Sequence, residues 1–431
     1  MSRVKRNKNK KIKSRIRIKK LVLFLSLLVL FASFLVMGMS KIFENRSKNT
    51  INHKNHEVIQ AITTSKSYKK INLNTVGDVM AHKPQLQAQY DASSKSYNFD
   101  NNFQCVGSFI EKSDLSIANL ETTLAGPSIP YTSYPAFNSP DTLIDALKNA
   151  GIDVLSTINN HSFDKGDLGV KRTLQVTKEK GVETVGTVQN LDDKNYIIKD
   201  INDIILGITS FSYGEIKNGT KYVNGIQISN ESKDKMNIFD MYSVDNAFNT
   251  IKEQLDNIKN TDIQIVILHW GNEYQRAPSE FQTKLAQKLS DYGVDIIIGS
   301  HPHVVQPVEM IKSSNGTNDT LVIYSLGNFL SNQRKELLGS PFTEDGLMVN
   351  IEITKDFNEN KTYVSQVECV PTWINKYQKS GKDVYEIIPI YDKNQLDTIE
   401  NLPISQVKAS YNNTISQIKQ SNIIKTPANP F

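Results

Sequence analysis

The sequence is poor in cysteine and lacks two common catalytic motifs. Its 431 residues include only Cys105 and Cys369, which excludes a disulfide framework and a cysteine-based metal site, while one disulfide or two free thiols both remain open. No G-x-x-x-x-G-K-[ST] loop occurs, because Gly381-Lys382 is followed by Asp383, and no G-x-S-x-G motif is present. P-loop nucleotide chemistry and serine-hydrolase chemistry are therefore unsupported, whereas glycosidase-type carboxylate pairs stay open, since their separation is not visible in a sequence.

Positive charge is concentrated at the N-terminus. Residues 1–20 contain eleven Lys and Arg and no acid, which leaves 39 basic and 45 acidic residues in the remaining chain. The formal net charge of +5 therefore belongs to the first twenty residues, and the rest of the chain carries about −6. This distribution does not indicate a nucleic-acid partner for the folded part.

An uncharged segment follows directly. Residues 21–39 contain nineteen residues without a charge, and at ~1.5 Å per residue a helix of this length spans about 28 Å, close to a bilayer's hydrocarbon core. A cleaved signal peptide is the alternative, but its apolar stretch is usually shorter and no clear small-x-small site follows Met39. The sequence thus favours a single transmembrane anchor, with residues 1–20 as a cytoplasmic tail and the rest outside the cell. Residues 40–70 are polar and predict a stalk.

From residue 71 onward, short apolar runs alternate with amphipathic stretches. Strands are predicted at Ile71–Val76, Leu115–Ala118, Val154–Ile158, Ile204–Phe211, Ile263–Leu268, Val294–Ile298, Leu321–Ser325 and Leu347–Ile353. Helices are predicted at Asp141–Asn149, Leu168–Lys180 and Phe281–Tyr292. This alternation predicts an α/β domain over 71–375. Residues 376–431 are predicted to form a partly disordered C-terminal extension, with one helix near 405–420 and a disordered end.

Polar side chains stand where five of these strands end. They are Asp78, Glu121, Asn160 with His161, His269, and His301 with His303. Open α/β sheets bind ligands outside the carboxyl ends of their strands, so these side chains are expected to converge. Imidazole, carboxylate and amide ligands without thiolate suit Mn, Fe or Zn, and a bridging carboxylate can hold two ions about 3.5–4 Å apart.

Each of these residues also has an ordinary structural interpretation. Asp78 could cap a turn, Glu121 could be a surface acid, Asn160 could cap a helix, and His269 could be a hydrogen-bonded core histidine. His301-Pro302-His303 is the stronger signal, because one stiff residue separates two imidazoles. The ordered set at successive strand ends favours a metal site.

Six short motifs carry a resemblance to a known family. They are VGDVM (76–80), NLE (119–121), NNH with Asp164 (159–164), HWGNEY (269–274), SHPHV-x-Q (300–306) and SLGNF (325–329). In wording and order they resemble the CapA-type capsule-synthesis proteins, which are tied to poly-γ-glutamate synthesis and export. The resemblance covers roughly residues 71–375. It implies a metallophosphatase-like α/β/β/α sandwich in a protein of the cell membrane whose main domain is extracellular.

The wider metallophosphatase pattern implies a role for each residue. Asp78 and His303 would bind one divalent ion, Asn160, His269 and His301 the second, and Glu121 would bridge them. His161, oriented by Asp164, would be the general acid. The chain departs from that pattern at Met80, where the phosphatases have His, and at Glu121, where they have Asp.

Two functions are compatible with this pattern. The first is a metal-dependent hydrolase or transferase that acts on poly-γ-glutamate, a phosphoester or a lipid- or wall-linked intermediate. The second is a non-catalytic subunit that binds the anionic polymer or the membrane synthase subunits. In either case Lys165, Arg172, Arg276 and Arg334 lie near the motif loops and could hold carboxylates, although each could also be an ordinary surface charge.

Overall fold

The computed structural model describes residues 25–28, 30–33, 35, 37 and 68–431, and these divide into two units, Met1–Tyr68 and Lys69–Phe431. In the first unit the described residues between 25 and 37 are α-helical. Within the described part of the chain, no helix combines the length and hydrophobicity needed to cross a membrane. The predicted tail at 1–20, nearly half of the predicted anchor at 21–39 and residues 40–67 of the predicted stalk lie outside the described residues. The last three residues of the stalk predicted at 40–70 belong instead to strand β1, which begins at Tyr68.

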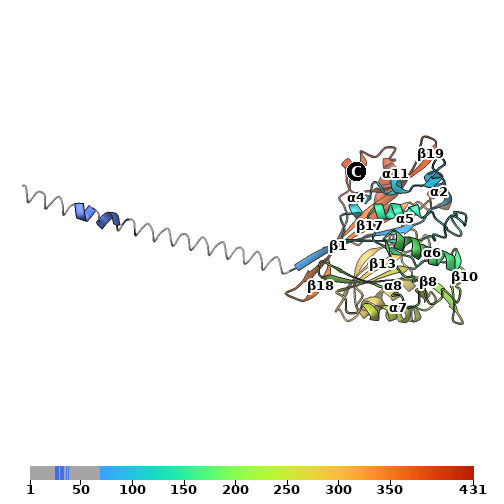
Figure 1. Ribbon diagram of the computed structural model, residues 1–431, viewed down its shortest axis with the longest axis horizontal. Coiled ribbons are helices and arrows are strands. Elements are labelled where there is room, and N and C mark those ends of the chain that lie inside the picture. Colours follow the sequence, from blue (N-terminus) through green and yellow to red (C-terminus); the bar gives the residue numbers. More distant parts are fainter. Residues whose placement is uncertain (1–24, 29, 34, 36, 38–67) are drawn as a thin grey trace, which may run out of the picture. The chain divides into compact units, whose positions relative to one another are not determined.

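The second unit is built on two large mixed sheets (Figure 1). The first sheet has the strand order β19 (Lys382–Pro389), β18 (Lys361–Lys379), β17 (Asp345–Asp356), β1 (Tyr68–Val79), β4 (Leu115–Leu120), β5 (Val154–Ser156) and β6 (Glu183–Val185), with β16 (Asn328–Leu330) beside β1 and β20 (Ile424–Lys425) beside β18. The second has the order β10 (Ile226–Gln227), β9 (Thr220–Val223), β8 (Ile204–Lys217), β12 (Ile263–His269), β13 (Ile296–Ser300), β15 (Asp319–Ile323) and β14 (Val308–Lys312), with β7 (Ile197–Ile201) and β11 (Ile238–Asp240) beside β8. A small hairpin pairs β2 (Tyr90–Asp91) with β3 (Ser96–Tyr97).

Each sheet contains a block of parallel strands, with antiparallel strands on one side of it in the first sheet and on both sides in the second. Strands β1, β4, β5 and β6 pair in parallel, as do β8, β12, β13 and β15. Antiparallel pairing links β17, β18 and β19 in one sheet and β14 with β15 in the other. Each of the eight predicted strands overlaps an observed one. The parallel blocks place many strand ends on the same side of the domain.

Helices surround the two sheets, and most of them cover the outer faces. They are α2 (Lys83–Gln89), α3 (Asp100–Phe103), α4 (Gly107–Ile110), α5 (Thr142–Asn149), α6 (Gly166–Glu179), α7 (Val244–Ile258), α8 (Glu280–Tyr292), α9 (Lys335–Leu338), α10 (Lys393–Leu396) and α11 (Ile404–Ile415). The helices predicted at 141–149, 168–180 and 281–292 correspond to α5, α6 and α8, and the helix predicted near 405–420 corresponds to α11, whereas α7 was not predicted. Figure 1 shows α4 and α5 over one sheet and α7 and α8 over the other.

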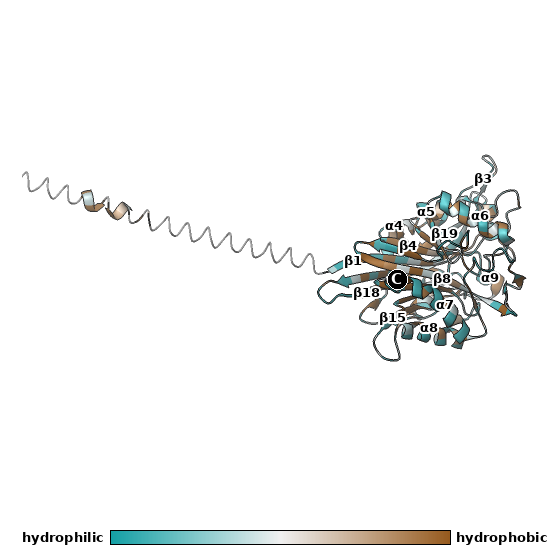
Figure 2. Ribbon diagram, turned by 60° about the horizontal axis from the view of Figure 1, so that its bottom comes forward, coloured by the Kyte–Doolittle hydropathy of each residue, from teal (hydrophilic) through white to brown (hydrophobic). Residues whose placement is uncertain are grey.

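Side-chain alternation along the strands builds the layers. On β4, Leu115 and Ile117 join a cluster shared by both sheets, while Ala118 and Leu120 face the cluster under α3 to α5. On β12, Ile265 joins the shared cluster, and Val266 and Leu268 pack under α7 and α8. Figure 2 shows apolar residues along the strands and hydrophilic residues on α7 and α8. The predicted α/β sandwich is therefore confirmed, and Lys69–Phe431 contains its own complete core.

The C-terminal region differs from the sequence prediction. Strand β18 crosses the predicted domain boundary at residue 375, and residues 376–431 belong to the same compact unit. The chain end is also held in place, because the Tyr411 hydroxyl donates to the Pro427 carbonyl at 2.9 Å and the Phe431 ring packs on Tyr411. The predicted partial disorder was therefore wrong. Residues 376–384, at the end of β18 and the start of β19, are mostly polar and are exposed or half-buried, so no apolar run crosses the predicted boundary.

The two cysteines are not paired. Both are free thiols, and they lie in different parts of the core: Cys369 in the cluster between the sheets and Cys105 against the cluster around Trp373. The disulfide alternative is thereby excluded.

Candidate metal centre

Both sheets contribute side chains to one buried site. Asp78 is the last residue but one of β1, Glu121 directly follows β4, and Asn160 and His161 follow β5 of the first sheet. From the second sheet, His269 ends β12, and His301 and His303 directly follow β13. All seven side chains are buried. The strand-end convergence expected from the sequence is present in the structure.

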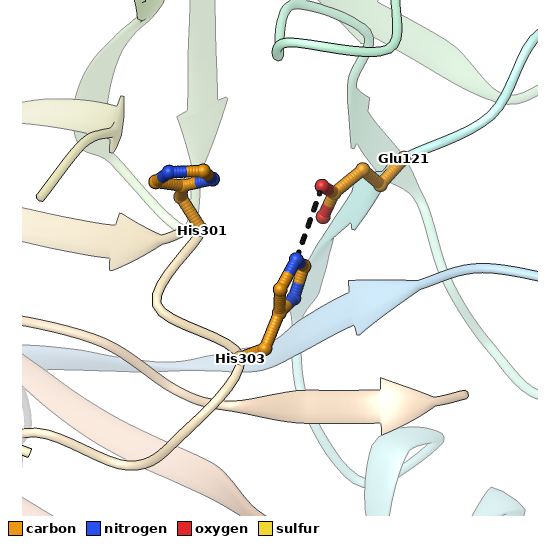
Figure 3. Close-up of side chains that lie close together, drawn as sticks. All are labelled: Glu121, His301 and His303. Carbon is orange, nitrogen blue, oxygen red and sulfur yellow. Dashed lines mark ion pairs between the residues drawn. The ribbon is translucent and has the colours of Figure 1, made fainter. Parts of the chain in front are cut away.

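Glu121 occupies the middle of this cluster. Its Oε1 lies 3.6 Å from Nε2 of His269 and 3.7 Å from Nε2 of His303. Figure 3 shows the His303 ring pointing at the Glu121 carboxylate, with the His301 ring beside them. Asn160 joins on the other side, because its Oδ1 lies 2.9 Å from Nε2 of His269. Glu121 thus stands between imidazoles of the second sheet, as a bridging ligand would.

Asp78 forms the second half of the cluster. Its Oδ2 lies 3.1 Å from Nδ1 of His303 and accepts from the His301 backbone N–H at 3.3 Å. Its Oδ1 accepts from Nδ2 of Asn119 at 2.8 Å. Two overlapping groups have ligand atoms within 4.8 Å of one another: Glu121, His301 and His303, and Asp78, Glu121 and His269.

The protein alone leaves this cluster without enough positive charge. Burial, and then the nearby Asp78, raise the pKa of Glu121 well above its usual value, while burial lowers the pKa of His269 and His301. Glu121 Oε1 and His301 Nδ1 are buried without a hydrogen-bond partner. Within residues 68–431, Lys and Arg form no ion pair with Asp78 or Glu121. One or two divalent cations would supply the missing charge and partners, and the nitrogen and oxygen donors fit Mn, Fe or Zn.

His161 and Asp164 form a hydrogen-bonded pair beside the cluster. Nδ1 of His161 lies 2.8 Å from Oδ2 of Asp164, and the same carboxylate oxygen accepts from the Phe137 N–H at 2.6 Å. The Phe137 ring packs edge-on against the His161 ring at 4.8 Å. These contacts fix the ring through Nδ1, which leaves Nε2 as the nitrogen that can exchange a proton with a ligand.

Met80 occupies the position at which the phosphatase pattern has a histidine. Met80 is buried, and its backbone N–H donates to Leu330 O at 2.8 Å. His82 does not take its place: its Nδ1 accepts from the Asn332 N–H at 3.2 Å, and its ring packs on Phe137. Burial lowers the pKa of His82 to about 3, so it stays neutral. The Asp78 half of the site therefore has one nitrogen ligand fewer than the phosphatase pattern.

Three further residues support the cluster and were not predicted. Asn119 bonds Asp78, Asn328 Oδ1 lies 3.2 Å from Nδ1 of His303, and the Tyr213 ring stacks parallel to His269 at 6.1 Å. Asn119 and Asn328 stand inside motifs quoted above, at the end of β4 and beside β1. Both amides lie close to the end of a predicted strand, which is the signal that selected Asn160. The same reasoning could therefore have indicated these two residues from the sequence.

The four basic residues near the motif loops contact other parts of the protein. Lys165 donates to Ala136 O, Arg172 forms a two-bond pair with Asp141, Arg276 donates to Asn413 O, and Arg334 pairs with Glu344 and donates to Ile374 O. These contacts stabilise the fold and engage charges for which the sequence had left open either a role in holding carboxylates or an ordinary surface position.

Comparisons with known proteins agree with the motif resemblance. Capsule biosynthesis protein CapA of Bacillus anthracis is 28% identical over 336 residues, covering 76% of this chain and 72% of the relative. PGA biosynthesis protein CapA of Bacillus subtilis (strain 168) is 29% identical over 295 residues, covering 65% of this chain and 67% of the relative.

Two solved structures are also similar. A structure titled as a novel phosphatase from Mycoplasma pneumoniae has a TM-score of 0.41 at 18% identity, covering 70% of this chain and 93% of that one. A protein of Thermus thermophilus has a TM-score of 0.34 at 8% identity, covering 68% of this chain and 97% of that one. TM-scores this low do not support assigning an activity to this chain.

The family match is extensive. Residues 72–333 match the family described as Bacterial capsule synthesis protein PGA_cap, a range that includes the six motifs and every side chain of the cluster. The resemblance found in the sequence is confirmed: the chain belongs to this family of bacterial capsule synthesis proteins.

Proposed function

We propose that this protein acts in the synthesis or export of a poly-γ-glutamate capsule, as a metal-dependent hydrolase or transferase. In this proposal residues 21–39 anchor the chain in the cell membrane, residues 1–20 stay in the cytoplasm, and the α/β domain works outside the cell. The family and the names of the two Bacillus relatives support the process. The nineteen uncharged residues and the basic residues before them support the topology.

The buried cluster supports the chemistry. The observation that carries it is the meeting of Asp78 and Glu121 with three imidazoles, with a Glu121 oxygen and a His301 nitrogen left unpartnered. Asp78, Glu121, Asn160, His269, His301 and His303 would hold one or two divalent ions. Such ions, when bound, activate water and stabilise negative charge on a substrate.

His161 would move the proton in this reaction. Asp164 hydrogen-bonds to Nδ1 of its ring, and Phe137 packs against the ring, so that Nε2 can donate a proton to a leaving group. Because the site is buried, the proton goes to the substrate rather than to bulk water.

The second candidate is a non-catalytic subunit that binds the polymer or membrane synthase components. Met80 favours it, because the Asp78 half of the site lacks a nitrogen ligand and His82 faces Asn332 instead. Such a site could hold one structural ion without turning over a substrate.

Metal analysis is the first test. The full-length chain should contain Mn, Fe or Zn after purification, and Glu121→Gln and His301→Ala should weaken binding at least about tenfold. Glu280→Gln is the matched control, because the Glu280 side chain is 81% exposed and pairs only with Lys284. A wild-type chain that neither contains nor binds a divalent ion would refute the proposal.

A second test separates the two candidate roles. His161→Ala leaves the six ligand side chains in place, so the enzymatic role predicts normal metal content and loss of polymer production. Full polymer production by folded, anchored His161→Ala would exclude the enzymatic role and favour the assembly role.

A further inference from the structure

A pocket of about 400 Å³ lies beside the metal cluster. Four separate segments line it: the start of α2, the loop after β4, the loop after β12, and the segment from β16 to α9. Its apolar lining includes Tyr134, Tyr274, Leu337 and Leu338, and all four are exposed to solvent. Helix α9 buries none of its residues, so its two leucines are not used for packing the core.

Residues that line the pocket pack close to residues of the metal cluster. The Tyr274 ring lines the pocket and lies 6.2 Å from the ring of His303. On another side, His82 lines the pocket and packs on Phe137, which in turn packs on His161. A molecule in the pocket would therefore lie next to the proposed metal ligand His303 and the proposed proton donor His161.

The charge of the lining does not suit a polyanion. Lys83 and Glu273 are its only formal charges, one of each sign, and they cancel. Neither forms an ion pair within residues 68–431. Poly-γ-glutamate has one carboxylate per residue, and recognition of several carboxylates uses clustered Arg or Lys. Besides the uncharged polar residues Ser133, Asn332 and Gln333, the pocket offers the aromatic and aliphatic surface of Tyr134, Tyr274, Leu337 and Leu338, which is typical of sites for uncharged organic groups.

One residue in the lining of this pocket, Tyr274, has a strained backbone. Tyr274 has φ +64°, in the left-handed region that a bulky residue rarely adopts. Its N–H donates to Pro302 O at 2.8 Å, between the two imidazoles of the His-Pro-His turn. Strained residues of this kind are concentrated at ligand sites, where the surrounding structure imposes the conformation. The strain places an aromatic ring between the pocket and His303.

We propose that this pocket binds an aliphatic chain of an amphiphilic substrate, whose anionic end reaches the metal cluster. Only the part of this inference that concerns the anionic end rests on the proposed function, because that end would reach the metal cluster. The site for the aliphatic chain consists of protein side chains and does not depend on a metal. It narrows the substrate class from the soluble polymer to a molecule that combines an apolar chain with a phosphate or carboxylate group.

Binding of two homologous series tests this proposal. The probes are n-alkyl phosphates and n-alkanols of two to eight carbons, titrated calorimetrically below their micelle concentrations into the compact unit Lys69–Phe431. Each added methylene should tighten binding about two- to fourfold in both series. Leu337→Asp and Leu338→Asp should abolish this dependence while metal content and thermal unfolding stay unchanged. Leu191→Asp is the matched control, because Leu191 is 66% exposed, Leu337 is 64% exposed, and Leu191 does not line the pocket.

The outcomes separate this inference from the proposed function. Chain-length dependence in the wild type and in Leu191→Asp, lost in the Leu337 and Leu338 variants, supports the pocket. Equal affinities for short and long chains, or full dependence in both pocket variants, would overturn it. If alkanols show the dependence but the protein binds no metal, the pocket stands and the proposed metal chemistry falls. Displacement of octanol by soluble γ-glutamyl oligomers would also overturn the proposal.

Discussion

Replacing Gly77 with alanine should damage both the fold and the metal cluster. Gly77 immediately precedes Asp78 on β1, and a Cβ at this position would lie 2.0 Å from Gly327 O and 2.9 Å from Gly327 C. Ordinary contact begins at 3.4 Å, so the two backbones would have to separate by about 1.4 Å. Neither atom belongs to a flexible side chain that could move aside.

The separation has two costs. It breaks the hydrogen bond from the Asp78 N–H to Gly327 O, which is 3.0 Å long, and it disturbs the register that sets Asp78 opposite Asn328. Overpacking costs about 1–3 kcal/mol and a lost hydrogen bond about 0.5–1.5 kcal/mol, so the free energy of unfolding should fall by about 2–4 kcal/mol. Displacement of Asp78 should weaken metal binding as well.

Urea unfolding of Lys69–Phe431 in chelator measures the packing cost without the metal contribution. Gly107→Ala is the control, because the nearest atom to its added Cβ is 3.9 Å away, and it should change stability by less than about 1 kcal/mol. If Gly77→Ala unfolds at the wild-type urea concentration and binds metal normally, the close approach of β1 to Gly327 is not what positions Asp78.

Three further predictions concern the core, pH and the metal. Ile265→Ala, in the cluster between the sheets, should lower the free energy of unfolding by about 2–5 kcal/mol, whereas Ile198→Ala, at a half-exposed site, should cost much less; urea unfolding compares the two. Burial raises the pKa of Asp345 to about 7, so the folded state holds this proton more tightly than the unfolded state, and the resulting stability is present at low pH and lost as pH rises through 7. Asp345→Asn should therefore become more stable relative to the wild type as pH rises from about 4 to 8; thermal unfolding across this range would contradict the reasoning if the difference stayed constant. Metal at about a thousand times its dissociation constant should raise the free energy of unfolding by about 4 kcal/mol in the wild type and by much less in Glu121→Gln, and an equal increase in both would place the ion elsewhere.

The sequence predicted the centre of the fold better than its edges. Strands such as β12 are buried on both faces and appear as continuous apolar runs, so they were found within a few residues. Residues 376–384, at the end of β18 and the start of β19, are mostly polar and are exposed or half-buried, and for this reason the region beyond residue 375 was predicted as a separate extension. Helix α7 also has a helical pattern, with Ala247, Ile251 and Leu255 on its buried face. This helix could therefore have been predicted from the sequence.

The sequence predicted which side chains converge but not the contacts between them. Strand-end position was enough to find Asp78, Glu121 and His269, because parallel strands share one edge. It could not show that Nδ1 of His303 faces Asp78 and Asn328 while Nε2 faces Glu121, since ring orientation depends on packing from both sheets. The pocket was also invisible, because its lining comes from four segments without a common motif.

The division of the ligands between the two sheets has a consequence for how the protein matures. The carboxylates and Asn160 come from the N-terminal half of the domain, and the imidazoles of His269, His301 and His303 come from later strands. Neither half alone assembles the full set, so tight binding of the proposed metal would require both sheets to have formed and docked. An ion held there would join the sheets as a cross-link and oppose their separation. Metal occupancy would then report on the integrity of the whole domain, and a truncated or misassembled chain would be recognisable by its failure to retain the ion.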